Sequence, residues 1–292
     1  MMQKVMSRGA AISAAVFLLL ALSGCFSTPL VKGTRTASMA MPEGRALQVE
    51  TRNGYIEVIR GDTAEVAVEA QVRVRSQERL DTVDVMPVDD GQRVSLRPLW
   101  PDGSSLQRNE GVSFKLVVPG VEGVTLETGN GHLKLQGLSG PAALETSNGR
   151  IEVREHAGEV SARTSNGSVV VHEVQGQVDV HTSNGDVEVR GAAGAVQVRT
   201  SNGSIEIALA EASRGPLTAI SSNGSVSVVL SPSFSGILTL KTSNGGIKLR
   251  DLPAARIIDS GKHEMKLQLG ESTEESRVVT SNGNVTVRLA AE

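Results

Sequence analysis

The chain has 292 residues, and its 29 Lys and Arg against 32 Asp and Glu give a net charge of −3 at pH 7. This balance lacks the basic excess of nucleic-acid-binding proteins, so no nucleic-acid partner is expected. The single cysteine excludes an internal disulfide and a cysteine-based metal site. Aromatic residues make up only 2% of the chain, and the prevalence of Val, Thr, Ser and Gly favours β-structure over helices.

The first 25 residues have the features of a bacterial export signal. Lys4 and Arg8 form a short basic segment, residues 10–21 are apolar, and Leu22-Ser23-Gly24-Cys25 follows. These last four residues resemble a lipobox, in which the thiol of Cys25 receives a diacylglyceryl group and becomes the mature N-terminus. The apolar run is shorter than the roughly 20 residues that a membrane-spanning helix needs. An ordinary signal peptide or an uncleaved anchor is the alternative, but the position of the only cysteine favours lipidation.

The predicted lipid indicates where the protein is located. Two or more acyl chains hold a protein stably on a membrane, since each buried methylene contributes about 0.8 kcal/mol. Phe26 and Ser27 follow Cys25 with no aspartate beside the anchor, which by resemblance to the sorting signals of double-membraned bacteria favours the outer membrane. We therefore expect a membrane-anchored lipoprotein of the bacterial envelope. Residues 1–24 are the signal peptide, and residues 25–45 are the lipidated cysteine and a flexible tether.

Residues 46–120 are predicted to form a first coil and an N-terminal antiparallel β-cap. The first coil is the segment around Asn53, over residues 47–58. A cap of this kind hides the open edge of a stacked β-structure. Trp100 is interpreted as a packing anchor of the cap rather than a ligand platform. The predicted elements of the cap are strands at residues 66–74 and 114–118 and a hairpin turn at Asp89-Asp90-Gly91.

From residue 121 onward the sequence is dominated by an internal repeat, the tetrapeptide Thr-Ser-Asn-Gly and its close variants. The spacing between its asparagines is 18 residues four times in succession, then 21 twice and finally 38. The last gap has room for one degenerate coil, in which Ser260-Gly261 would be a degenerate copy of the corner motif. Together with that of the first coil, the asparagines of the motif are Asn53, Asn130, Asn148, Asn166, Asn184, Asn202, Asn223, Asn244 and Asn282.

Each repeat also has a fixed hydrophobic pattern. Apolar residues occupy the second and fourth positions after the glycine of the motif, as do Val169 and Val171. A second glycine, such as Gly176, then marks another turn, and the alternation resumes with Val178 and Val180. Period-two alternation in short runs between glycines indicates half-buried strands, so each unit supplies two strands and two turns. In the other units, the second and fourth positions after the glycine of the motif are occupied by Leu133 and Leu135, Ile151 and Val153, Val187 and Val189, Ile205 and Ile207, Val226 and Val228, Ile247 and Leu249, and Val285 and Val287.

Two architectures fit two strands and two turns per unit. One is a chain of hairpins, because Asn-Gly is a strong two-residue hairpin signal. The other, which we favour, is a single-chain β-solenoid (β-helix-like) whose coils of about 18–21 residues stack on one another. Stacking would place the Thr and Asn of every motif on the inward side with the valines and align the asparagine amides in a ladder. Asn and Gly also tolerate the left-handed backbone angles of a tight corner.

The sequence contains no convincing metal site. The five histidines occupy different positions of the repeat, and no two of them have His-x-x-x-His spacing. His172 and His181 are predicted to be solvated on outward positions. The corners carry neutral asparagine where calcium-binding β-rolls carry aspartate, so no calcium ladder is expected.

Three carboxylates do share one slot of the repeat, namely those of Glu152, Glu188 and Glu206. Some β-helix enzymes cleave polysaccharides with carboxylates clustered on one face. Here Val170 interrupts the row, arginines lie nearby in the sequence, and the scarcity of aromatic residues leaves few ring faces to hold a sugar. We therefore expect no catalytic residues and no cofactor.

One longer segment carries a family resemblance. Residues 118–131 read Val-Pro-Gly-Val-Glu-Gly-Val-Thr-Leu-Glu-Thr-Gly-Asn-Gly, and repeated Thr-Ser-Asn-Gly with Ile/Val-x-Val follows. This pattern resembles the bacterial "putative adhesin" domain family of unknown function over roughly residues 46–290. The resemblance implies a β-helical fold and an envelope location, and some relatives are associated with envelope stress responses. It implies no catalytic residues.

The sequence thus predicts an all-β chain in which residues 46–120 form the first coil and β-cap and residues 121–292 form the Thr-Ser-Asn-Gly repeat solenoid. The favoured function is a non-enzymatic envelope lipoprotein, an adhesin-like binding or structural module with a repetitive β-surface. Its expected partners are the membrane, through the N-terminal lipid, and an unidentified ligand in the envelope, in the matrix or on a host surface. The alternative is a periplasm-facing sensory or structural lipoprotein linked to envelope stress. A carbohydrate-active β-helix enzyme is the third hypothesis.

Overall fold

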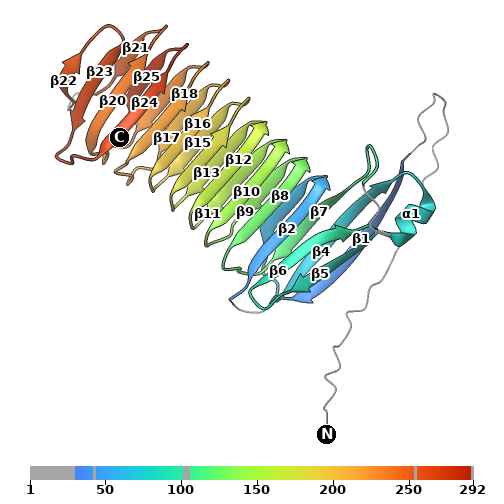
Figure 1. Cartoon of the computed structure of the whole chain (residues 1–292). Helices are drawn as coiled ribbons and strands as arrows, with labels where there is room; N and C mark the ends of the chain where they lie inside the picture. Colours follow the sequence, from blue (N-terminus) through green and yellow to red (C-terminus); the bar gives the residue numbers. More distant parts are fainter. Residues whose placement is uncertain (1–29, 42–43, 101–105, 253–254, 291–292) are drawn as a thin grey trace.

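The protein is a long rod built from two β-sheets that face each other along its whole length (Figure 1). The computed structural model describes residues 30–41, 44–100, 106–252 and 255–290. Sheet A has 12 strands and sheet B has 13. Cys25 and the predicted signal peptide lie outside the described residues.

Each repeat contributes one strand to each sheet. In spatial order, the coil strands of sheet A are β3 (Ile56–Arg60), β9 (Leu133–Gln136), β11 (Ile151–His156), β13 (Val169–Val174), β15 (Val187–Ala192), β17 (Ile205–Leu209), β19 (Val226–Leu230), β25 (Val285–Leu289) and β21 (Ile247–Arg250). Those of sheet B are β2 (Ala46–Asn53), β8 (Val124–Asn130), β10 (Ala142–Asn148), β12 (Val160–Asn166), β14 (Val178–Thr182), β16 (Val196–Thr200), β18 (Leu217–Ser221), β24 (Glu275–Thr280) and β20 (Gly236–Thr242). Within each series neighbouring strands are parallel, and equivalent positions of successive repeats lie side by side, as do Val153 and Val171.

This pairing confirms the solenoid and excludes the chain of hairpins. In a hairpin chain, the two strands of one repeat would pair with each other in antiparallel fashion. Instead, β10 pairs in parallel with β8 and β12 of the neighbouring repeats. The next strand along the chain, β11, lies in the other sheet. Each repeat is therefore one turn of a flattened coil.

The core lies between the two sheets and consists of the predicted alternating residues. Ile151 and Val153 are fully buried, and so are their counterparts along nearly the whole rod. Burial of one such side chain contributes roughly 1.5–3 kcal/mol, which makes this continuous apolar column the main source of stability. Ile247 and Leu249 are only partly buried, because β21 is the edge strand of sheet A.

The glycines of the motif are required for a different reason than the sequence suggested. A left-handed corner was expected, but the glycine after Asn166 does not have a positive φ. A Cβ atom on that residue, Gly167, would lie 1.9 Å from the carbonyl oxygen of Gly149 in the coil below. Glycine is needed because the stacked backbones approach each other too closely for any side chain. Left-handed residues occur instead at the opposite corner, where Glu155 and Glu173 have φ values of 53° and 56°.

At the N-terminal end both sheets extend beyond the first coil. Sheet A continues with β7 (Gly111–Val118), β4 (Glu65–Val74) and β1 (Val31–Ala40), and sheet B with β6 (Arg93–Leu99) and β5 (Asp84–Asp89). The pairs β1–β4, β4–β7 and β5–β6 are antiparallel, which confirms the antiparallel cap. The helix α1 (Gln77–Thr82) buries Leu80 at this end. Among the described residues, no helix is long and apolar enough to span a membrane.

The prediction of a flexible tether up to residue 45 is wrong for part of that segment. Strand β1 pairs with β4 over its full length, from Val31 opposite Val74 to Ala40 opposite Glu65. Its residues alternate between half-buried and exposed. The sequence did not show this strand because Gly33, Thr34 and Ser38 suggest a linker, whereas pairing with β4 decides the structure.

The order of the last coils also differs from the order in the sequence. The coil formed by β24 and β25 lies between the coils of β18–β19 and β20–β21. The prediction of a degenerate coil cornered at Ser260-Gly261 is therefore wrong. Gly261 instead closes a hairpin between β22 (Arg256–Ser260) and β23 (Glu264–Leu269), and β23 pairs antiparallel with β20. This hairpin extends sheet B beyond the last coil.

Candidate functional site

The asparagines of the motif form an unbroken ladder along one corner of the rod. Each side-chain Nδ2 donates to the Oδ1 of the preceding rung, as Asn166 does to Asn148 at 2.9 Å. The first rung, Asn53, donates to the backbone carbonyl of Glu110 at 3.1 Å. In spatial order the rungs are Asn53, Asn130, Asn148, Asn166, Asn184, Asn202, Asn223, Asn282 and Asn244.

The predicted inward placement of these asparagines is wrong. All but Asn53 are exposed, and Asn53 is half-buried. The alternation of the strand ends at the threonine of the motif, because the chain turns the corner at the following serine and asparagine. The ladder is thus a solvent-exposed row of amides in which successive rungs are one strand spacing apart, roughly 4.8 Å.

The threonines, in contrast, are buried and hold the corner together. Thr164, only 4% exposed, donates from Oγ1 to the carbonyl oxygen of Gly149 at 3.2 Å. Thr146 and Thr182 make the same bond to the equivalent glycines. A buried hydroxyl is costly unless it is hydrogen-bonded, so each of these bonds fixes one coil on the coil below.

The outer face of sheet A carries two parallel rows of side chains. One row contains Glu152, Glu188 and Glu206, and the other contains Arg154 and Arg190. The Nε atoms of the two arginines lie 2.5 Å and 2.7 Å from carboxylate oxygens of Glu152 and Glu188. These partly exposed surface ion pairs contribute little to stability individually, but they neutralise the middle of the face.

The same ion pairs bear on the enzyme hypothesis. A glycosidase-type acid needs a carboxyl group whose pKa is raised, so that it can donate a proton. The hydrogen bond and charge of Arg154 lower the pKa of Glu152 below its ordinary value. At Glu152 the row therefore provides an ionised, arginine-bound carboxylate rather than a proton donor.

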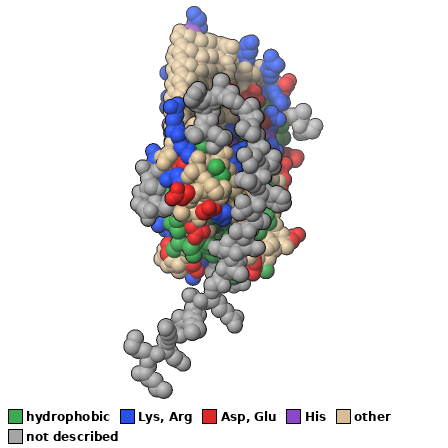
Figure 2. Space-filling model, turned by 90° about the vertical axis from the view of Figure 1, so that its right-hand side faces the viewer, with side chains coloured by type: hydrophobic (Ala, Val, Ile, Leu, Met, Phe, Trp, Pro, Cys, Tyr) green, Lys and Arg blue, Asp and Glu red, His purple; other side chains and the backbone are tan. Residues whose placement is uncertain are grey.

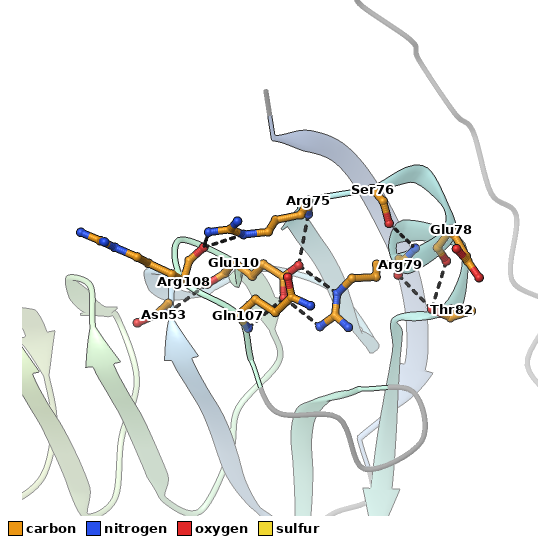
Figure 3. Close-up of polar contacts among 9 residues, drawn as sticks. All are labelled: Asn53, Arg75, Ser76, Glu78, Arg79, Thr82, Gln107, Arg108 and Glu110. Atoms are coloured by element: carbon orange, nitrogen blue, oxygen red, sulfur yellow. Dashed lines mark hydrogen bonds and ion pairs between the residues drawn. The ribbon is translucent and has the colours of Figure 1, made fainter. Parts of the chain in front are cut away.

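The cap contains a buried ion pair that joins its helix to the loop before β7 (Figure 3). The carboxylate of Glu110 has no exposed surface and accepts bonds from the Arg79 guanidinium at 2.8 Å and 2.9 Å. The backbone N–H groups of Arg75 and Gln107 donate to it as well. Burial raises the pKa of Glu110, but these donors outweigh burial and leave the pKa below its ordinary value. The guanidinium of Arg79 also lies 5.7 Å from the ring centre of Trp100, which packs against the core as predicted.

The histidines do not converge on a site. His172 and His181 lie on outward positions, as predicted. His132 stacks on Tyr55 with 4.9 Å between ring centres. His156, unlike the others, is buried in the core. Within the described ranges, no group of three or more His, Cys, Asp or Glu side chains is placed to hold a metal ion.

Seen from its N-terminal end, the rod shows scattered positive and negative side chains (Figure 2). Hydrophobic side chains are visible at this end as well, where Met86 and Val88 on the edge strand β5 are about half exposed. Equivalent positions recur from coil to coil on the long side faces and along the corner ladder rather than at this end.

The chain belongs to the Toastrack DUF4097 family, whose profile matches residues 44–288. This membership agrees with the family resemblance and with the solenoid. No match is found among curated proteins.

Several solved structures are similar to the chain. A protein described as a putative adhesin from Parabacteroides distasonis is 10% identical, with 88% of this chain and 97% of that chain covered and a TM-score of 0.37. A putative cell adhesion protein from Clostridium sporogenes is 10% identical, with 89% and 100% covered and a TM-score of 0.25. A putative lipid binding protein from Parabacteroides distasonis is 8% identical, with 88% and 97% covered and a TM-score of 0.26.

Proposed function

We propose that the protein is a non-enzymatic, lipid-anchored module of the bacterial envelope that binds an extended ligand or acts as a structural rod. The observation that supports this most is the parallel, in-register stacking of the coils. It repeats each outward position along the rod, as in the rows that contain Ser161 and Arg163 on the outer face of sheet B. A repeated surface of this kind suits a polymer or another extended surface better than a small substrate.

Such a surface distributes binding over many contacts. Along a row, equivalent positions recur at roughly 4.8 Å, one strand spacing. Each exposed contact adds little, so affinity arises from the number of coils engaged at once. Single substitutions on the outer faces are therefore expected to weaken binding modestly, and one substitution that abolished binding would contradict this proposal.

The lipid is the second part of the proposal. The sequence Leu22-Ser23-Gly24-Cys25 supports acylation of Cys25, and the absence of an aspartate at residues 26 and 27 supports the outer membrane. The first described strand, β1, begins at Val31, so the cap would lie within a few residues of the lipid. The coils would then extend away from the membrane surface.

Protease accessibility on intact cells tests which side of the membrane the rod faces. Lysed cells serve as the digestion control, and Cys25→Ser serves as the control for anchoring. Digestion on intact cells would support a surface-exposed, adhesin-like role. Protection until lysis would contradict that role and support a periplasm-facing structural or sensory lipoprotein instead.

A further inference from the structure

The two rows of side chains on the outer face of sheet A change in charge at the C-terminal end of the rod. The carboxylate row reaches Glu206 and then continues through Ser227 and Thr286 to Lys248. The neighbouring row ends with Arg288 and Arg250. The outer face of the last three strands, β19, β25 and β21, thus carries three cations and no carboxylate.

The altered strand order brings two of these cations together. Because β25 lies between β19 and β21, Arg288 is directly beside Arg250, although 38 residues separate them in the sequence. Parallel neighbours are roughly 4.8 Å apart, and like charges at this separation repel each other. A binding partner of opposite charge would relieve this repulsion.

No protein group neutralises this cluster in the part of the chain that the structure describes. Lys248, Arg250 and Arg288 are exposed, and no carboxylate lies within 4.0 Å of their charged atoms. Asp251 follows Arg250 at the corner, but it too forms no ion pair. In the middle of the same face, by contrast, Arg154 is ion-paired.

We propose that Lys248, Arg250 and Arg288, with the hydroxyl of Thr286, form a binding site for a phosphate-bearing ligand. Two adjacent guanidinium groups can bind phosphate oxygens through paired N–H donors. Lys248 adds a further charge diagonally opposite Arg288, and Thr286 lies between Ser227 and Lys248 in its row. Because β21 is an edge strand, the site is open on one side to a ligand larger than a single phosphate.

The phosphate can come from a lipid headgroup or from a soluble polymer, and the site chemistry is the same for both. This inference deepens the proposed binding role and rests on it, but it does not depend on the location of the rod. The competing explanation is that the cations only protect β21 from pairing with another chain, as charges on edge strands commonly do.

The test uses the full chain with two double variants. Arg250→Gln/Arg288→Gln removes two cations of the proposed site. Arg154→Gln/Arg190→Gln is the matched control, since it makes the same chemical change on the same face at arginines that are ion-paired. Binding is measured to phosphatidylglycerol vesicles, to phosphatidylcholine vesicles and to soluble polyphosphate. The N-terminal segment is identical in all variants, so its own affinity for vesicles cancels in the comparison.

Removal of each site cation is expected to weaken binding about fivefold, or about 25-fold for the double variant, and less at high salt. The control should change binding less than about threefold. If the site variant, and not the control, loses binding only to phosphatidylglycerol vesicles, the ligand is a lipid headgroup. If it loses binding only to polyphosphate, the ligand is a soluble polymer. Equal losses in both variants, or no binding of either probe by the unaltered chain, would overturn the proposal. Lys248→Gln, expected to lose about fivefold, provides a second site variant if the double variant aggregates.

These results are independent of the protease experiment. A rod that is protected on intact cells can still bind phosphate through this site. Conversely, a surface-exposed rod that binds neither probe would retain its proposed location and lose this ligand.

Discussion

The side-chain Nδ2 of Asn244 donates a hydrogen bond of 2.8 Å to the Oδ1 of Asn282, although Asn282 comes 38 residues later in the sequence. Asn282 in turn donates to Asn223 at 2.8 Å. The amide ladder is therefore continuous in space where the chain is not continuous in order. The ladder and the backbone pairing specify the same register for the inserted coil.

An interior rung of the ladder should matter more than the terminal rung. Asn184 makes two ladder bonds, one to Asn166 and one from Asn202, whereas Asn244 makes one. Each bond contributes roughly 0.5–1.5 kcal/mol, so Asn184→Ala should lower the free energy of unfolding by about twice as much as Asn244→Ala. Urea unfolding followed by circular dichroism measures both. Equal losses would show that the ladder bonds contribute nothing beyond local corner geometry.

A side chain on a stacked corner glycine should be strongly destabilising. Gly167→Ala places a Cβ against the Gly149 carbonyl, at 1.9 Å before any relaxation. Overpacking against backbone is expected to cost about 3 kcal/mol or more, since the coils must separate locally. Gly120→Ala is the control, because its Cβ meets no atom within 4 Å. Similar melting temperatures for the two variants would contradict the stacking explanation.

The corner shows what the sequence could and could not predict. The strands, the buried valines and the stacking of coils follow from period-two alternation and the repeat, which are local signals. The side on which Asn166 lies does not, because the alternation fails where the chain turns. The pairing of β25 with β21 could not be predicted either, because nothing in the local sequence of residues 285–289 distinguishes one neighbouring coil from another.

The buried histidine should make stability depend on pH. His156 is 1% exposed, its Nε2 bonds to the Gly140 carbonyl at 2.8 Å, and its Nδ1 has no hydrogen-bond partner. Burial lowers the pKa of His156 below its usual value. The unfolded chain therefore binds the proton more readily than the folded chain does. The contribution of neutral His156 to folding stability is intact above about pH 6.5 and is lost as the pH falls below that value.

The matched variant is His156→Leu, since Leu138 occupies the same position one coil earlier. Denaturant unfolding at about pH 7.5 and about pH 5 should show that the variant loses less stability on acidification than the unaltered chain. Parallel pH profiles for the two proteins would count against a neutral buried imidazole.

The ion pair between Arg79 and Glu110 should be essential for the stability of the cap. Glu110→Ala removes the buried carboxylate that accepts bonds from Arg79 and from two backbone N–H groups. Breaking a buried pair in this way costs about 3 kcal/mol or more. Because the pKa of Glu110 is lowered, its stabilisation is present above the ordinary pKa of a glutamate and is lost as the pH falls below it. Glu78→Ala, an exposed change on α1, should have little effect on thermal unfolding.

The cation cluster at the far end was likewise beyond sequence reasoning. Arg250 and Arg288 fall in separate repeats, and each alone reads as an ordinary outward residue. Their side-by-side placement depends on the strand order, which brings β25 and β21 together. By comparison, the proposed lipidation of Cys25 rests on a contiguous motif and was inferred without tertiary information.

The proposed envelope role depends on acylation of Cys25, which mass spectrometry of the mature protein purified from membranes measures. The N-terminal residue is expected to be Cys25, and its thiol is expected to carry a diacylglyceryl group. A mature chain that retains residues 1–24, or that begins elsewhere with an unmodified Cys25, would contradict this expectation.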